Sequence, residues 1–236
     1  MKNETTFYND ASASLDMGLR KYMLNVFSYM SAGLALTAIF AYMLGNSVSA
    51  MSLMFSSPGL ALLLAIIPFG IVLYMSVRIS EISSDTAKIL FFVYSACIGV
   101  TMAPIFAIYT QASIAYTFFV TSAMFLSMVI YGYTTGKDLT GFGAFLFMGL
   151  IGLILASLIN LFLRNTMTDH IISVIGVFIF TGLTAYDSQR IKNMYLESEA
   201  NEIREKKAVF GALALYMDFI NLFLYILKFL GKARDR

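Results

Sequence analysis

Hydrophobic stretches of about 20 residues recur along the whole chain, and short polar segments separate them. A helix of that length crosses a bilayer and satisfies its own backbone hydrogen bonds there. The pattern therefore predicts an all-α membrane protein with seven transmembrane helices, forming a single domain over residues 22–236. The predicted spans are, in order, Tyr22–Leu44, Leu60–Val77, Ala87–Tyr109, Ala112–Tyr133, Thr140–Leu163, Ile171–Asp187 and Ala208–Leu230.

Rigid and small residues indicate how individual spans are shaped. Pro68 and Pro104 lie inside the second and third spans, where each removes a backbone donor and is expected to kink its helix. Little more than Thr110 and Gln111 separates the third span from the fourth, which predicts a tight antiparallel hairpin. Small residues recur at helical spacing on the fifth span and favour close helix packing. They are Gly149, Gly152 and Ala156.

The composition agrees with the membrane class and excludes several kinds of site. Hydrophobic residues make up 59% of the chain and charged residues 13%, against about 25% charged in soluble proteins. A net charge of +2 is too small to indicate a nucleic-acid partner. The single cysteine, Cys97, and the single histidine, His170, exclude a disulfide and a multi-Cys or multi-His metal site. With no nucleophile motif or phosphate loop, we expect neither an enzyme nor a bound cofactor.

Basic residues predict the orientation in the membrane. With seven spans, 11 of the 16 Lys and Arg residues lie on the side that holds the N-terminus and the loops after spans two, four and six. That side is therefore expected to be cytoplasmic, and residues 1–21, which do not resemble a signal peptide, to form a polar cytoplasmic arm. The basic tail after Leu230 argues mildly against this arrangement, because it lies on the other side.

Asp218 lies about halfway along the seventh predicted span. Placing a carboxylate at that depth costs roughly 2.5–3.5 kcal/mol unless it is protonated, paired or facing water. Small and polar residues share its helical face and are candidates to line a pore or wall a cavity in a central helix. They are Gly211, Ala214, Asp218, Asn221 and Tyr225. The alternative is an Asp that hydrogen-bonds a neighbouring helix only for assembly.

Two further charged residues are expected at the cytoplasmic ends of their spans. Asp187 ends the sixth span, and Arg190 follows three residues later, within reach of a local ion pair. Arg78 ends the second span at roughly the depth of Asp187. It is either a basic anchor at the membrane edge or a counter-charge that changes partner as the acids change protonation.

Two segments resemble the C-terminal signature of the Bax inhibitor-1 family, and the chain looks like a bacterial member over all its spans. The segments are Thr181-Gly-Leu-Thr-Ala-Tyr-Asp-Ser-Gln-Arg-Ile-Lys and Ala212-Leu-Ala-Leu-Tyr-Met-Asp-Phe-Ile-Asn-Leu-Phe-Leu-Tyr-Ile-Leu. The resemblance implies seven helices with the last one central, and a pH-sensitive calcium leak. It also implies that Asp187 and Asp218 are the proton-sensing latch and that Arg78 engages the latch in one state. Bacterial relatives have also been linked to a membrane-bound AAA protease.

The leading hypothesis is a Ca²⁺ leak channel of the bacterial inner membrane, gated by protonation of Asp187 and Asp218. The two carboxylates would meet in a closed state, directly or through one water, and would be weak, transient Ca²⁺ ligands. One alternative is an inhibitor or other regulator of a membrane-bound AAA protease, contacted through residues 1–21. Another is a proton-coupled transporter. If the acid pair is not the sensor, Glu81 and His170 are the next candidates.

Overall fold

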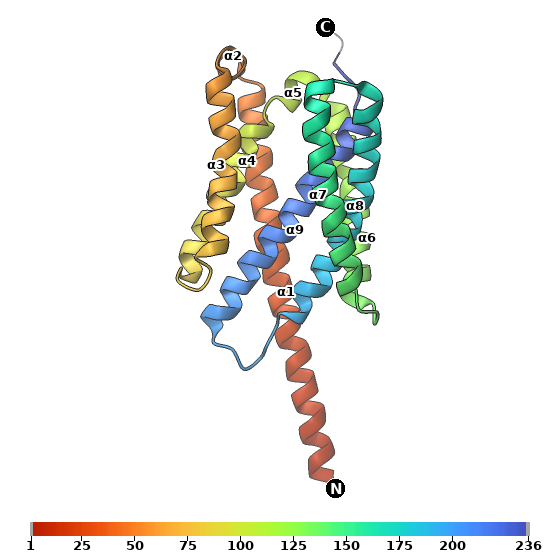
Figure 1. Cartoon of the computed structure of the whole chain (residues 1–236). Coiled ribbons are helices and arrows are strands. Elements are labelled where there is room, and N and C mark those ends of the chain that lie inside the picture. Colours follow the sequence, from red (N-terminus) through yellow and green to blue (C-terminus); the bar gives the residue numbers. More distant parts are fainter. Residues whose placement is uncertain (1, 235–236) are drawn as a thin grey trace.

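The computed structural model describes residues 2–234, with side chains for residues 17–57, 59–60 and 62–234. Its helices pack side by side along one axis (Figure 1). One end, called here the N-terminal end, holds the start of the first helix and the α3–α4, α6–α7 and α8–α9 connections. The helices are α1 (Lys2–Gly45), α2 (Val48–Ser56), α3 (Pro58–Val77), α4 (Ser84–Met102), α5 (Ile105–Ile108), α6 (Gln111–Thr134), α7 (Thr140–Leu163), α8 (Thr166–Asn193) and α9 (Asn201–Leu230).

Within the described residues, six helical segments are long and apolar enough to cross a membrane. The predicted class, an all-α membrane protein, is thereby confirmed. The second predicted span corresponds to α3, of which the stretch Leu62–Val77 is a shorter apolar helix within the residues whose side chains are described. The six segments are Met17–Gly45, Ser84–Ile108, Gln111–Thr134, Thr140–Leu163, Thr166–Asn193 and Asn201–Leu230.

The helix boundaries follow local chemistry. The third predicted span is broken, since α4 ends at Met102 and α5 begins after Pro104, whereas α3 continues through Pro68. Thr110 caps α6 by accepting a hydrogen bond from the backbone N–H of Ser113. The tight hairpin predicted for the third and fourth spans is wrong, because α4 packs against α1, α3 and α9, whereas α6 packs against α8 and α9. The sequence pattern missed α2, a short helix capped by Ser47. The predicted arm, residues 1–21, lies largely outside the described side chains, and α1 begins at Lys2.

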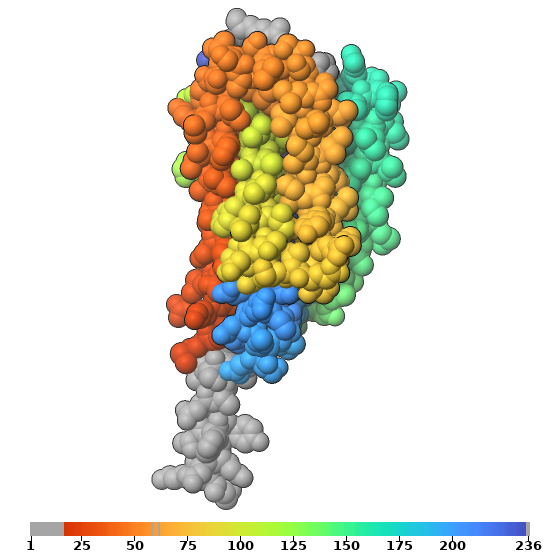
Figure 2. All heavy atoms as spheres, turned by 90° about the vertical axis from the view of Figure 1, so that its left-hand side faces the viewer, coloured from red at the N-terminus to blue at the C-terminus, as the bar shows by residue number. Residues whose placement is uncertain are grey.

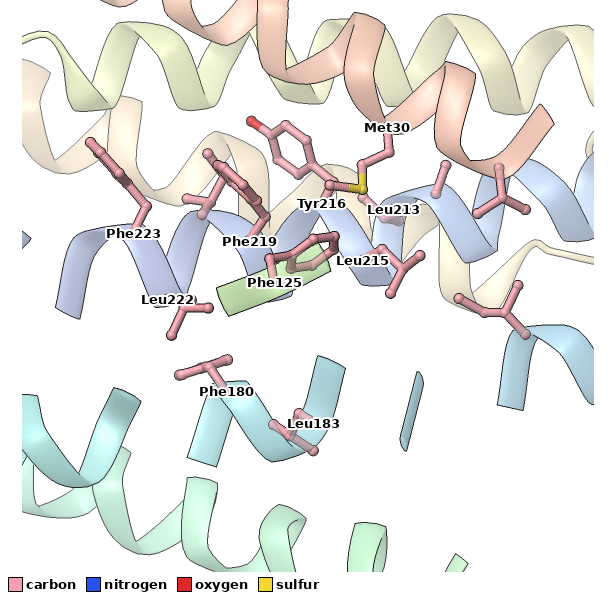
Figure 3. Close-up of a cluster of buried hydrophobic side chains, with 14 of the residues drawn as sticks. Met30, Phe125, Phe180, Leu183, Leu213, Leu215, Tyr216, Phe219, Leu222 and Phe223 are labelled. Atoms are coloured by element: carbon pink, nitrogen blue, oxygen red, sulfur yellow. The ribbon is translucent and has the colours of Figure 1, made fainter. Parts of the chain in front are cut away.

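Helix α9 is the most buried of the membrane-spanning helices. In its most apolar part 67% of the residues are buried, compared with 56% in α8 and 33% or less in the others. It packs against α1, α4, α6 and α8. Figure 3 shows the side chains of Tyr216 and Phe219 on α9 among Met30 of α1, Phe125 of α6 and Phe180 of α8. The core of the molecule therefore follows α9.

Glycines bring α8 close to both α6 and α7. Gly132 of α6 lies directly against the backbone of Ala185, and Gly143 of α7 lies under the ring of Tyr186. The predicted close packing through Gly152 is wrong, because that residue is exposed and a Cβ there would meet no atom within 4 Å. Helix α7 buries a different face, which carries Gly143, and of the predicted stripe Gly149 approaches α8 at Ile179.

The same substitution at two glycines should have opposite effects on stability. Gly132→Ala places a methyl group against the Ala185 backbone, and such overpacking should lower the free energy of unfolding by about 1–3 kcal/mol. Gly152→Ala adds a methyl group in open space and improves helix propensity, so stability should stay equal or rise by about 0.5–1 kcal/mol. Melting temperatures of the two variants in the same detergent test this. Equal losses for both would contradict the α6–α8 packing.

Candidate functional site

Hydrogen bonds attach the C-terminal part of α8 to α6. The Ser188 hydroxyl donates to the carbonyl oxygen of Val129 at 2.9 Å, and Lys192 Nζ donates to the carbonyl oxygen of Tyr133 at 2.8 Å. Together with the Gly132 contact, these bonds hold this segment of α8 in place. Asp187 lies within the anchored segment and beside α9.

Asp187 and Asp218 are neighbours across the α8–α9 interface, where each carboxyl group affects the charge of the other. Their surroundings differ. The Asp187 side chain is 15% exposed, and its Oδ1 lies 3.7 Å from Nη1 of Arg190. Asp218 is 5% exposed, and its Oδ2 is buried with no hydrogen-bond partner among the described residues. A negative charge on the pair is therefore better accommodated on Asp187 than on Asp218.

Arg78 does not approach the acid pair in this structure. It follows α3 directly and pairs with Glu81 in the α3–α4 connection, where both side chains are largely exposed. The basic partner of Asp187 is Arg190, which confirms the local ion pair expected from the three-residue spacing.

The small and polar stripe on α9 lies against α8. Gly211 faces Ile191, and the ring of Tyr225 covers Gly176. Tyr225 also stacks on Phe180 of α8, with ring centroids 5.7 Å apart. Asn221 turns to its own helix, where its Nδ2 donates to the carbonyl oxygen of Met217 at 2.8 Å. Gly211 and Tyr225 therefore belong to a packed helix interface, and Ala214 between them is half-buried.

A second polar contact of α9 lies two residues before Asp218. The Tyr216 hydroxyl is 2.5 Å from Oγ1 of Thr37 on α1, and Thr37 in turn donates to the carbonyl oxygen of Ser95 on α4 at 2.8 Å. Tyr216 is fully buried, with its ring edge-to-face against Phe91 and Tyr94. The sequence analysis missed this contact. The only signal was a tyrosine inside an apolar helix, which has many equally good explanations.

Several buried hydroxyl oxygen atoms on α6 and α8 have no hydrogen-bond partner among the residues that the structure describes. They include the hydroxyls of Thr117 and Thr121 on α6 and of Thr181 on α8. The face of α6 that carries Thr117 and Thr121 also carries Phe125, which packs on Phe219 of α9. An unsatisfied buried hydroxyl costs about 1–3 kcal/mol unless water or an ion satisfies it. Helices α6 and α8 thus carry buried oxygen atoms that water or a cation could satisfy.

The other candidates from the sequence lie apart from the acid pair. His170 is exposed, and its Nδ1 is 2.8 Å from the carbonyl oxygen of Thr166 on its own helix. Cys97 is a half-buried free thiol on α4. The described part of the chain contains no group of three or more His, Cys, Asp or Glu side chains able to hold a metal ion.

Comparisons with known proteins agree with the resemblance. Residues 19–235 match the family model described as "Inhibitor of apoptosis-promoting Bax1". An uncharacterized protein of Borreliella burgdorferi is 47% identical over 91% of this chain and 93% of its own length. Protein RP147 of Rickettsia prowazekii, also uncharacterized, is 44% identical over 94% of both chains. The inner membrane protein YbhL of Escherichia coli K12 is 44% identical over 92% of this chain and 94% of its own length.

Replacing Asp218 should reveal whether its carboxyl group stabilises the fold. Because Oδ2 has no partner, Asp218→Leu removes a buried polar group at similar volume and should raise the free energy of unfolding by about 1–3 kcal/mol. The matched control is Ser188→Ala, which removes a satisfied hydroxyl from α8 and should lower stability by about 0.5–1.5 kcal/mol. Thermal melting in detergent distinguishes the two. A lower melting temperature for Asp218→Leu would mean that Asp218 serves assembly.

Proposed function

The chain belongs to the Bax inhibitor-1 family of membrane proteins, and we propose that it is a pH-sensitive calcium leak channel of the bacterial inner membrane. The observation that carries the proposal is the Asp218 carboxyl group, buried with a free oxygen beside Asp187. A membrane protein that retains such a costly group is expected to use it. The name of the 44% identical relative YbhL, an inner membrane protein, supports the same location here.

We infer that the chain crosses the membrane seven times, with α3 as the additional span and α9 in the centre. Helix α3 has 20 residues, the length that spans a bilayer. The start of α1 and the end of α9 lie at opposite ends of the molecule, as an odd number of crossings requires (Figure 1). The burial of α9 among four helices supports its central place. The N-terminal end, where most basic residues gather, would face the cytoplasm.

Proton exchange at the acid pair would control the α8–α9 interface. One proton shared by Asp187 and Asp218 leaves a single negative charge, which Arg190 can offset from α8. Losing that proton places two like charges at short range in a medium of low dielectric constant, where their repulsion is strong. Since α8 is fixed to α6 by Ser188 and Lys192, the repulsion would act mainly on the position of α9.

A loosened interface would open a path lined with oxygen atoms. Water that enters between α6, α8 and α9 would reach the unpartnered hydroxyls of Thr117, Thr121 and Thr181. Hydroxyl and carboxylate oxygens are the ligands that Ca²⁺ prefers. Two carboxylates and a few hydroxyls bind Ca²⁺ weakly, which suits an ion that must leave again. Calcium is therefore the permeant ion of the proposal, and the protein needs no resident cofactor.

In the alternative state we propose that Arg78 takes part as the second counter-charge. Its pair with Glu81 is exposed, and such pairs contribute only about 0–1 kcal/mol, so exchanging the partner costs little.

Calcium flux into proteoliposomes across a pH series tests the proposal. The wild type should show flux that changes with pH, and Asp187→Asn/Asp218→Asn should flatten that dependence, since neither amide titrates. Asp138→Asn is the control at the same end of the molecule. The Thr140 side chain and backbone N–H keep the pKa of Asp138 below its usual range, so Asp138 stays ionised throughout and its replacement should leave the profile unchanged.

Each other result points to a different explanation. If the double variant keeps the wild-type pH profile, the proton sensor is another group, and Glu81 and His170 are the next candidates. Absence of flux at every pH would favour the protease regulator, and saturable exchange driven by a proton gradient would favour the transporter.

Arginine replacements test which cation acts on the pair. Arg190 lies 3.7 Å from Asp187 and favours its ionised form, so Arg190→Gln should move the midpoint of the flux profile to higher pH. The shift should be at most about 1 pH unit, because the guanidinium is largely exposed and screened. Arg78→Gln should leave the midpoint unchanged if Arg78 acts only at the membrane edge, and should move it if Arg78 is the second counter-charge. If Arg190→Gln leaves the midpoint of the flux profile unchanged, Arg190 does not act on the acid pair.

A further inference from the structure

A polar cavity of about 280 Å³ lies at the N-terminal end, away from the acid pair. Its lining comes from the first residues of the α1 span, from the α8–α9 connection and from the beginning of α9. Figure 2 shows the beginning of α9 at this end of the molecule, next to α1 in that view. The side chains that matter for its chemistry are Lys21, Tyr22, Tyr195, Asn201, Arg204 and Glu205.

The charges around this cavity leave an excess of positive charge. The one carboxylate that lines it, Glu205, is neutralised by Lys88, whose Nζ lies 2.8 Å from Oε2. Nearby Glu199 is likewise held by Lys207 at 2.6 Å. Lys21 and Arg204, by contrast, form no ion pair among the described residues. The cavity therefore has two cations whose charge the described carboxylates do not offset.

Arg204 and Tyr22 also hold unused hydrogen-bond donors. Arg204 donates to the carbonyl oxygen of Glu197 and to the side chain of Asn201, which leaves part of its five N–H groups free. Tyr22 is only 4% exposed, and its hydroxyl is buried without a hydrogen-bond partner. A buried hydroxyl in this condition indicates a missing partner.

The beginning of α9 adds to the same preference. Its N-cap residue is Ala200, which provides no side-chain hydrogen bond, and its first residue, Asn201, lines the cavity. The N–H groups and the dipole at this helix start favour negative charge, to which Glu202 in the first turn already contributes.

We propose that this cavity binds a phosphate-type oxyanion, with Arg204 and Lys21 as its charged ligands and Tyr22 as a hydroxyl donor. Arg204 would provide paired N–H donors that match phosphate oxygens, and Lys21 a point charge. The ligand would connect α1 to α9 at their N-terminal ends. Free phosphate and the headgroup of an anionic phospholipid offer the same chemistry, and the cavity lies beside Met17, where the apolar part of α1 begins.

Binding to the full-length protein tests the proposal. Protein in phosphatidylcholine nanodiscs is titrated with inorganic phosphate and followed by ³¹P NMR line broadening. In a parallel arm, protein from nanodiscs that contain phosphatidylglycerol is examined by native mass spectrometry for retained lipid. Arg204→Gln and Lys21→Gln should each weaken binding about tenfold or more, and Tyr22→Phe by roughly three- to tenfold. The control Lys137→Gln removes the same charge from an exposed position at the same end and should leave binding unchanged.

The outcomes separate the sources and the alternatives. Binding in the first arm alone identifies free phosphate, and retention in the second arm alone identifies the lipid headgroup. Binding in neither arm overturns the proposal, and so does an equal loss with Lys137→Gln, since that would indicate general surface charge. Melting temperatures identify variants that fail to fold. If the charge variants fail to fold, Tyr22→Phe decides the matter, because it keeps the ring and loses only the hydroxyl. Unchanged binding by this variant would show that the hydroxyl is not a ligand and would contradict the site.

Discussion

A buried carboxyl group with one unpartnered oxygen is the constraint on which the rest of this structure depends. Asp218 lies in the most buried helix, and within the described part of the chain its Oδ2 has no hydrogen-bond partner. The acid beside it, Asp187, is already offset by Arg190. The fold must hold two acids together where a second negative charge is expensive. Around this point α8 is held to α6 by the hydrogen bonds of Ser188 and Lys192 and packs on α7 at Gly143.

Helix α9 is held differently on its two sides. Toward α1 and α4, Tyr216 forms a hydrogen bond with Thr37 and packs edge-to-face on two aromatic rings, and none of these contacts titrates near neutral pH. Toward α8, the contact includes the acid pair, whose charge depends on protonation. One side of α9 is therefore independent of pH, and the other responds to it. Such an asymmetry allows a local change of charge to alter one helix interface and leave the remainder of the bundle intact.

Much of this arrangement could be read from the sequence, and the exceptions have physical reasons. Apolar length predicted the membrane class, because it depends only on local chemistry. A kink was expected at both Pro68 and Pro104, and the helix is broken at Pro104 but continues through Pro68. The three-residue spacing predicted the pair of Asp187 with Arg190. The face that α7 buries could not be read, since Gly143 and Gly152 look alike until the neighbouring helix is placed. The contact of Tyr216 with Thr37 joins residues 179 positions apart and has no local signal.

The central claim is that a proton at the acid pair sets the spacing of α8 and α9. The most direct measurement is the distance between spin labels at Asn193, the last residue of α8, and Glu202, near the start of α9, in a Cys97→Ala background. Pulsed electron paramagnetic resonance across a pH series should give one transition between two distances. Asp187→Asn/Asp218→Asn should abolish that transition. A distance that stays constant with pH, or a transition that survives in the double variant, would contradict the account.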